Sequence, residues 1–303
     1  MLALCVTQWF GIERLRSITA LQALTPLVLV VAVPISFAAL VTGRYPLAVT
    51  AVIPLLTLAW LSYPIESRKG ASAAAADAPH LTIAYGNLLY TNPTPVGAAR
   101  VLLAADADVM VMVELATPLH EALTNETPAD DYPHRAEFID GGGTAIGVWS
   151  RLPMVSGGLV DVTGRPTVDV VLALAGRSVR LVGVHPYPPT KNAVGWSAQL
   201  EAIGALTADS TLPAVVIGDF NASRWHPSFR TLLTAGLRDS HEALGHGWGA
   251  SWPTDRGVLP PPFVRIDHAL FGDGITPVAV VDLTIPGSDH RGFVVTFGFT
   301  QGE

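Results

Sequence analysis

Pro213-Ala-Val-Val-Ile-Gly-Asp-Phe-Asn-Ala-Ser223 joins a short apolar run to two polar side chains. The run from Ala214 to Ile217 is rich in β-branched residues and predicts a buried strand. Asp219 and Asn221 follow it, and polar residues at the end of a buried strand lie at the rim of a sheet, where open α/β folds place their chemistry. Gly218 is expected to let the backbone turn without a Cβ clash. The alternative is an ordinary turn, in which Asp and Asn are common.

Polar side chains end other predicted strands in the same way. Residues 81–87 read as a strand that ends in Asn87, and the apolar run over 109–113 is followed by Glu114. A buried carboxylate is rare unless it is paired or bound to a metal, whereas a Glu exposed in a loop is the plain alternative. The recurrence of the pattern favours a functional site over isolated turns.

Histidines and further carboxylates follow in the second half of the chain. His185 comes directly after a strand predicted over 178–184 and precedes a proline run, which suits a catalytic histidine better than a structural one. Asp267 lies inside a strand predicted over 264–270.

Asp289 and His290 precede the last apolar strand, over 293–299. The carboxylates Glu114 and Asp289 are hard oxygen ligands that suit Mg²⁺ or Mn²⁺. Histidines with carboxylate partners suit proton transfer. Together these groups describe metal-assisted hydrolysis of a phosphate ester.

The segment from residue 239 to 263 is long and rich in Gly, Pro and aromatic residues. Loops of this length are usually functional or disordered. Its Trp248 and Trp252 could stack on nucleobases or insert at a bilayer surface. His241 and His246 resemble a zinc-protease pair, but histidines five residues apart do not share a helix face, so we exclude that site.

The N-terminal part predicts a membrane anchor over residues 1–65. Half of the chain is apolar, and its mean hydropathy of +0.41 arises largely from two uncharged stretches near the N-terminus. A span needs about 20 apolar residues, so we expect transmembrane helices at about 18–42 and 46–65, joined as a hairpin. A cleaved signal peptide is the alternative, but it does not explain two long runs. Residues 66–79 read as a linker, and the large domain occupies 80–303.

The charge pattern bears on which side of the membrane the large domain occupies. Arg14 and Arg16 precede the first predicted span, and Arg68 and Lys69 follow the second. The positive-inside rule places both ends in the cytoplasm if there are two spans, whereas a third span would place the domain outside. The single cysteine, Cys5, precludes a disulfide in the large domain.

The large domain is acidic. The first 70 residues hold five of the 18 basic and two of the 25 acidic side chains, so the remainder carries a formal charge of about −10. This disfavours a protein that grips long DNA through many phosphate contacts. It suits a site that gathers carboxylates around a divalent metal.

The order of these motifs resembles the endonuclease/exonuclease/phosphatase superfamily of DNase I-like metal phosphoesterases, over residues 81–299. The motifs stand in family order: Gly86-Asn87, Val113-Glu114, Ser150-Arg-Leu-Pro153, His185-Pro186, Gly218-Asp-Phe-Asn221, Arg265-Ile-Asp-His268 and Ser288-Asp-His290. The resemblance implies a four-layer α/β sandwich, two β-sheets face to face with helices outside, here preceded by the transmembrane hairpin of a membrane-anchored, bacterial-type member.

The resemblance also implies roles for individual residues. Glu114 would be the main ligand of Mg²⁺ (or Mn²⁺), with Asn87 and Asp289 close to the metal. His290 would transfer protons, oriented by Asp267.

Other residues would bind and activate the reactants. Asp219 would position or activate the attacking water, and His185 and Asn221 would stabilise charge on the phosphoryl oxygens. Arg151 and Trp252 are candidates for substrate binding. His268 stands where relatives have Tyr or His and is interpreted as a neighbour of the site.

The expected function is therefore a membrane-anchored, divalent-metal-dependent phosphoesterase of the nuclease or phosphatase type. Its substrate could be a nucleic acid, a phospholipid headgroup or a small phosphoester, and residues 18–65 would bind the lipid bilayer as a multi-pass anchor in the cell membrane. The alternative is a non-catalytic, membrane-tethered binding module that keeps the fold.

Overall fold

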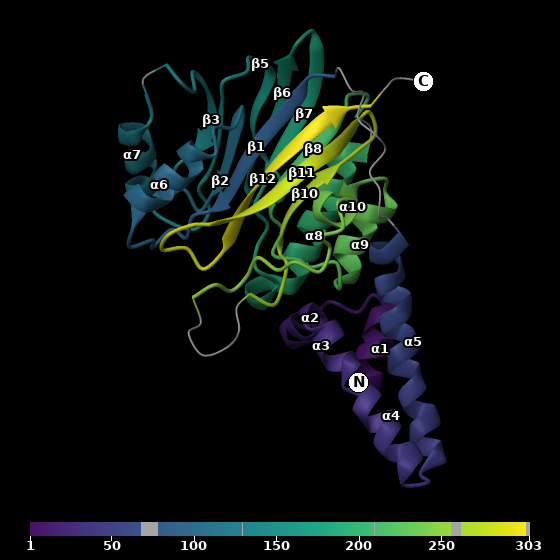
Figure 1. Cartoon of the computed structure of the whole chain (residues 1–303). Coiled ribbons are helices and arrows are strands. Elements are labelled where there is room, and N and C mark those ends of the chain that lie inside the picture. The colour runs from purple at the N-terminus through teal and green to yellow at the C-terminus, as the bar shows by residue number, and fades with distance from the viewer. Residues whose placement is uncertain (68–77, 129, 209, 256–261, 301–303) are drawn as a thin grey trace.

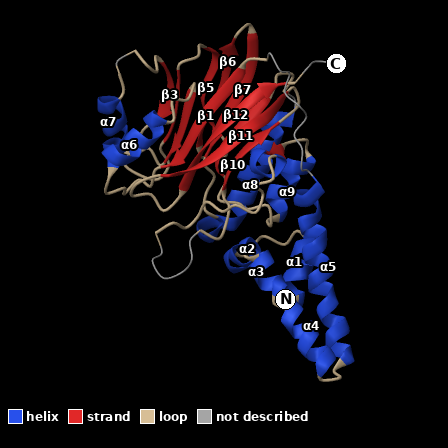
Figure 2. Cartoon of the chain, in the orientation of Figure 1, coloured by secondary structure: helices blue, strands red, loops and turns tan. Residues whose placement is uncertain are grey.

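The computed structural model describes residues 1–303 except 68–77, 129, 209, 256–261 and 301–303. In the described part of the chain, two six-stranded sheets pack face to face, and helices lie on their outer faces (Figure 1; Figure 2). The predicted four-layer α/β sandwich is confirmed.

Each sheet combines parallel and antiparallel strands. The first has the order β11-β12-β1-β2-β4-β3. Its strands are β1 (His80–Asn87), β2 (Val109–Val113), β3 (His134–Phe138), β4 (Ile146–Ser150), β11 (Ile275–Thr284) and β12 (Arg291–Phe299). The second has the order β5-β6-β7-β8-β10-β9. Its strands are β5 (Met154–Asp161), β6 (Pro166–Leu174), β7 (Arg177–Val184), β8 (Ala214–Asp219), β9 (Arg238–Asp239) and β10 (Asp267–Phe271).

Helices complete the outer layers. The first sheet is covered by α6 (Pro95–Ala104) and α7 (Thr117–Glu126), and the second by α8 (Pro189–Ala208) and α9 (Pro227–Thr234), with the short α10 (Ser240–Ala243) beside β10. Strands β2 and β8 are buried on both faces. This double burial explains why their sequences are continuous apolar runs rather than alternating ones.

The parallel pairs bring polar strand ends together. In the first sheet Asn87 lies beside Val113, the residue before Glu114. In the second sheet Val184 lies beside Gly218, so His185 and Asp219 are neighbours. Gly218 has a different role from the expected one. It lies within the strand, and a Cβ there would sit 1.9 Å from the carbonyl oxygen of Val184, so glycine permits close strand approach rather than a turn.

The N-terminal part consists of five helices in the described chain: α1 (Leu2–Phe10), α2 (Arg16–Ala23), α3 (Thr25–Val30), α4 (Ala32–Val41) and α5 (Tyr45–Ser67). Helices α4 and α5 pack side by side and project away from the sandwich (Figure 1). Among the described helices, α5 is long and apolar enough over Tyr45–Tyr63 to cross a membrane. The predicted linker over 66–79 lies largely outside the described residues.

The predicted first span over 18–42 is bent in the structure, and together its two helical parts are long and apolar enough to form one broken span. Residues 16–23 form α2, and the chain then bends by 70° into the helical stretch Thr25–Val41. Pro26 lies in the first turn of α3, where its missing N–H is harmless and starts a new helix. Thr19 and Gln22 of α2 are buried against protein, because α2 packs on α8 of the sandwich. Hydropathy alone did not separate this protein-facing helix from the apolar stretch that follows it.

Buried polar contacts attach α1 and α2 to the sandwich. Gln8 Nε2 donates to the carbonyl oxygen of Trp225 at 2.9 Å. The backbone N–H of Ser228 donates to Glu13 Oε2 at 2.8 Å. His226 accepts from the backbone N–H of Ser223 at Nδ1, at 2.9 Å, so its Nε2 carries the proton and donates to the Thr19 carbonyl oxygen, also at 2.9 Å.

His226 should make the protein less stable in acid. Burial lowers the pKa of His226 to about 4, whereas an unfolded His titrates near 6.5. The unfolded chain therefore binds more protons, and stability falls as pH drops from about 6.5 through 4, by up to about 3 kcal/mol. We expect the melting temperature of His226→Gln to fall less over this range than that of the wild type. Equal pH slopes for both proteins would contradict the assignment.

Candidate active site

The polar strand ends of both sheets meet at one edge of the sandwich. In the first sheet Asn87 ends β1 and Glu114 follows β2, and in the second His185 follows β7 and Asp219 ends β8. Asp267 begins β10 directly opposite Asp219 in the antiparallel register. The loop before β12 adds Asp289 and His290.

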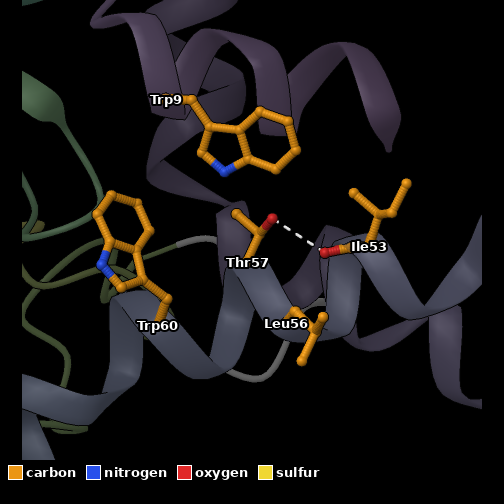
Figure 3. Close-up of a pocket in the computed structure, with 5 residues that line it drawn as sticks. All are labelled: Trp9, Ile53, Leu56, Thr57 and Trp60. Carbon is orange, nitrogen blue, oxygen red and sulfur yellow. Dashed lines mark hydrogen bonds between the residues drawn. The ribbon is translucent and has the colours of Figure 1, made fainter.

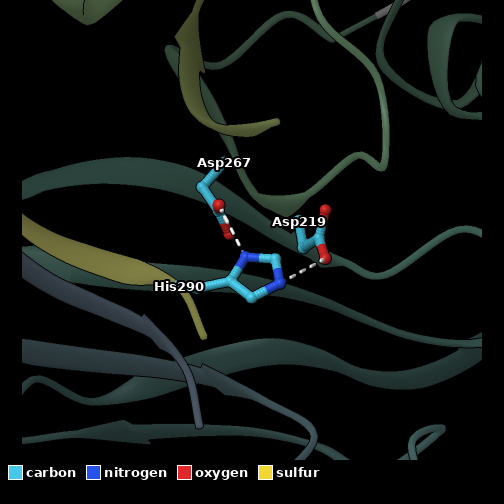
Figure 4. Close-up of side chains that lie close together, drawn as sticks. All are labelled: Asp219, Asp267 and His290. Carbon is cyan, nitrogen blue, oxygen red and sulfur yellow. Dashed lines mark hydrogen bonds and ion pairs between the residues drawn. The ribbon is translucent and has the colours of Figure 1, made fainter. Parts of the chain in front are cut away.

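His290 and Asp267 form a buried pair (Figure 4). His290 Nδ1 lies 2.9 Å from Asp267 Oδ2, and the Tyr85 hydroxyl donates to Asp267 Oδ1 at 2.7 Å. Although burial opposes the charge, the neighbouring carboxylate of Asp267 raises the pKa of His290 to about 10. Burial likewise opposes ionisation of Asp267, but His290 and the hydrogen bonds keep its pKa below the usual value. The pair is therefore an imidazolium held against a carboxylate.

Asp219 faces this pair from the end of β8. Its Oδ2 lies 3.9 Å from His290 Nε2 and 3.8 Å from His185 Nε2. It accepts from Asn87 Nδ2 at 3.1 Å, and its Oδ1 accepts from the Asn221 N–H at 2.7 Å. Burial and the charge of Asp267 raise the pKa of Asp219 to about 8. Asp219 can therefore hold a proton at neutral pH, as a group that exchanges protons in a reaction must.

His185 is kept neutral. Burial, together with the positive charges of Arg165 and His290, lowers the pKa of His185 to about 3. Its Nε2 points towards two carboxylates, 3.8 Å from Asp219 and 4.0 Å from Glu114. Arg165 Nε donates to the carbonyl oxygen of His185 at 3.0 Å, which fixes the backbone at this strand end.

Glu114 is held by its backbone and by its neighbours. Its φ of +54° lies in the left-handed region, which costs a non-glycine residue about 1 kcal/mol and is often found at functional sites. The side chain accepts from the Tyr90 N–H at 3.0 Å and from Asn87 Nδ2 at 3.3 Å. Asn221 has a φ of +49°, so both strand-end residues turn their backbones in the same unusual way.

The residues present fit a divalent cation. Asp219, Asp267 and His290 have ligand atoms within 4.8 Å of one another. However, both oxygens of Asp267 already accept from Tyr85 and His290, which describes a proton-transfer pair better than a metal ligand. Glu114 and Asp219, linked through the Asn87 amide, offer hard oxygens instead. Burial, followed by the charge of Asp267, raises the pKa of Asp219, and a cation beside this carboxylate would favour its ionised form.

The two candidates for substrate binding lie in different places. Trp252 Nε1 donates to Asp289 Oδ2 at 3.0 Å, and the indole ring lies 6.5 Å from the His290 ring. Arg151 is not brought to this group. It follows β4 next to Asp108, at the end of β2 opposite Glu114, and its guanidinium pairs with Asp106 and Asp131 at 2.7 and 2.9 Å. Two carboxylates at the far edge thus occupy Arg151.

His268 forms a second, separate pair. Its Nδ1 lies 2.6 Å from Asp239, and its Nε2 lies 2.9 Å from the carbonyl oxygen of Ala222. Both ring nitrogens are therefore occupied within the fold. This placement agrees with its interpretation as a neighbour of the site.

Three supporting residues were missed by sequence reasoning. Tyr85 occupies an apolar position of β1, so nothing in the pattern marks its hydroxyl as a partner of Asp267. Ser288 Oγ donates to the carbonyl oxygen of Asn87 at 2.7 Å and accepts from the His290 N–H at 3.0 Å. Ser251 Oγ accepts from the Asp267 N–H at 3.3 Å. Ser288 stands two residues before His290 in the sequence, but the sequence does not indicate its hydrogen bond to Asn87.

A cavity of about 600 Å³ opens over these groups. Its polar side is lined by Glu114, Asp219, Asn221, Asp289 and His290. Trp252 and Lys191 stand at its border, and residues of α2 line the other side. This is enough space to hold a phosphoester and part of its substituents.

The chain is similar to known proteins in both sequence and fold. A family model described as "Endonuclease/Exonuclease/phosphatase family" matches residues 84–290. No curated protein matches the sequence significantly.

Among solved structures, TDP2 of D. rerio complexed with single-strand DNA product is 18% identical, with a TM-score of 0.63 over 72% of this chain and 99% of that one. Sphingomyelinase C from Streptomyces griseocarneus is 19% identical, with a TM-score of 0.54 over 72% and 99%. An endonuclease/exonuclease/phosphatase family protein from Leptotrichia buccalis is 15% identical, with a TM-score of 0.57 over 72% and 100%. At these identities the likeness concerns the fold.

Proposed function

The chain belongs to the endonuclease/exonuclease/phosphatase family, and from this premise we propose that it is a divalent-metal-dependent phosphoesterase anchored in a membrane. The observation that supports the proposal is the His290–Asp267 pair, whose His290 Nε2 lies 3.9 Å from Asp219 Oδ2 where both residues line the cavity. Metal-assisted attack of water on a phosphoester needs a proton donor, a proton acceptor and oxygen ligands for a cation. His290, Asp219 and the neighbouring carboxylates could supply them.

We assign the cation to Glu114, with Asn87, Asp219 and Asp289 around it. These side chains supply the oxygen atoms that Mg²⁺ or Mn²⁺ prefers. When bound, the cation would supply positive charge for the phosphoryl oxygens. The remaining chemistry belongs to the protein's own residues.

The hydrolysis can be written with the residues present. Water forms a new P–O bond while the P–O bond to the leaving alcohol breaks. Asp219 orients the water and takes one of its protons, and His290 Nε2, held cationic by Asp267, gives a proton to the leaving oxygen. His185 and the Asn221 amide offer N–H groups to the charge that builds on the phosphoryl oxygens.

The test is turnover of phosphodiesters by the full chain in detergent micelles. The full chain is needed because residues of α1 and α2 satisfy buried polar groups of the sandwich. We expect Mg²⁺- or Mn²⁺-dependent hydrolysis of methyl p-nitrophenyl phosphate that EDTA abolishes. Arg151→Ala, at the far edge, should keep this activity. Turnover that is insensitive to EDTA, or none with any divalent metal, would overturn the proposal and favour a binding module.

A further inference from the structure

Helix α2 forms one wall of the catalytic cavity. Thr19, Ala20 and Ala23 of this helix, and Leu24 directly after it, line the cavity together with the catalytic side chains. The cleft is therefore built jointly by the sandwich and by the segment that leads into the apolar hairpin. This juxtaposition is absent from the sequence motifs, which all lie beyond residue 80.

The wall is held in place. His226, which itself lines the cavity, donates to the Thr19 carbonyl oxygen at 2.9 Å. Arg230 Nη1 donates to Gln8 Oε1 at 2.9 Å, and Glu13 accepts from the Ser228 N–H. The first contact holds α2 itself, which also packs on α8, and the other two hold α1 and the connection that leads into α2. Because these contacts are buried or partly buried, they fix α2 against the sandwich.

The wall continues directly into the hairpin. At Leu24 the chain turns by 70° from α2 into α3 and α4, which pack with α5 (Figure 1). At the sandwich end of α5, Leu61 packs against Trp225. Trp9 and Trp60 flank an apolar groove between α1 and α5 and remain 49% and 57% exposed (Figure 3). Exposed Trp near the end of an apolar helix is typical of the bilayer interface. With α5 in a membrane, the cavity would lie beside the headgroup layer.

The cavity is lined by both polar and apolar side chains. The α2 side presents the small apolar side chains of Ala20 and Ala23, and Phe263 and Val264 extend the apolar surface. Lys191 is the single Lys or Arg among the described residues that line the cavity. Binding of a nucleic acid through its phosphates needs many basic side chains. A molecule with one phosphate and an apolar part would instead contact both the polar and the apolar residues of this lining.

We propose that α2 selects the substrate and that the substrate is a phosphodiester lipid taken from the bilayer. The phosphate would lie against Asp219 and His290, with the apolar part along α2. Hydrolysis would add water to phosphorus and release an alcohol and a phosphate monoester. This inference rests on the proposed phosphoesterase function and adds the source of the substrate.

The test compares lipid with soluble substrate in the full chain. Vesicles of phosphatidylglycerol and phosphatidylcholine in equal parts, or of sphingomyelin and phosphatidylcholine, are the lipid probes, with products followed by ³¹P NMR. Methyl p-nitrophenyl phosphate is the soluble reference, and single-stranded DNA is the competing class. We expect at least one lipid to be hydrolysed faster than the DNA.

Two Trp variants on α2 test whether the part of this helix that lines the cavity affects the choice of substrate. Ala20→Trp fills the cavity side, so the ratio of kcat/KM for lipid over that for the soluble diester should fall at least about tenfold, which corresponds to about 1.4 kcal/mol. Leu21→Trp, next to it but outside the cavity lining and 42% exposed, should leave the ratio unchanged.

The outcomes separate the two proposals. Three results would overturn the role of α2 while leaving the phosphoesterase intact. They are hydrolysis of the soluble diester but of no lipid, faster hydrolysis of DNA than of any lipid, and the same ratio of kcat/KM for lipid over soluble diester in both Trp variants. Absence of hydrolysis of every substrate with any divalent metal would overturn both.

Discussion

Replacing His290 by Ala should lower kcat for phosphodiester hydrolysis by about 10²- to 10⁴-fold, the usual contribution of a positioned acid or base. The reason is that His290 Nε2 is the cationic N–H that faces Asp219 and the cavity. Steady-state kinetics at saturating metal measure the effect. A loss of less than about threefold would remove His290 from the reaction.

The second buried pair supplies a matched control. His268 bonds to Asp239 as His290 does to Asp267, but both of its nitrogens are occupied within the fold. His268→Gln should lower the melting temperature and leave kcat of the folded protein near the wild-type value. Equal kinetic losses at His268 and His290 would show that both act through stability alone.

The pH profile identifies how His290 acts. If it donates a proton, activity falls above the pKa of His290, which the carboxylate of Asp267 raises. Asp267→Asn removes that charge, so the alkaline limb of kcat should move to lower pH. A purely structural Asp267 would reduce kcat without moving the limb.

We expect Glu114→Gln to weaken binding of Mn²⁺ and to lower kcat by about 100-fold or more. Loss of groups that merely support metal ligands already costs about 10- to 100-fold, so loss of a direct ligand should cost at least as much. Calorimetry with Mn²⁺ and kinetics measure both effects. The Gln side chain can still accept from the Tyr90 N–H, so the fold should survive.

Glu126→Gln is the control, because Glu126 is a surface carboxylate paired with Arg100. It should leave both Mn²⁺ affinity and kcat unchanged. If Glu114→Gln kept full affinity while His290→Ala abolished it, the cation would instead lie among Asp219, Asp267 and His290. The two variants together therefore locate the metal.

Much of the site could be predicted because its residues are tied to local sequence signals. Glu114 and Asp219 each follow an apolar run that is buried on both faces of a sheet. Parallel strands carry their carboxyl ends to the same edge, so the strand-end pattern fixes a shared location once the strands are identified. Arg151 shares the pattern of a polar residue after a strand, but β4 runs antiparallel to β2 and carries Arg151 to the opposite end.

The supporting partners could not be predicted, because their role lies in contacts distant along the chain. Tyr85 and Asp267 are 182 residues apart, and a tyrosine in a strand is equally consistent with packing. His226 reads as a loop residue, and its bond to Thr19 bridges 207 positions.

Apolar runs and the polar residues that end them are local properties, so the strands and their acidic ends could be predicted from sequence, and the order of the motifs added the family resemblance that implied the sandwich. Only the tertiary structure decided that residues 16–23 leave the apolar stretch and wall the cavity. A high hydropathy indicates that a helix is buried away from water, but it does not distinguish burial in a bilayer from burial against protein. The choice between them depends on partners such as His226 and Ser228, which only folding brings within reach.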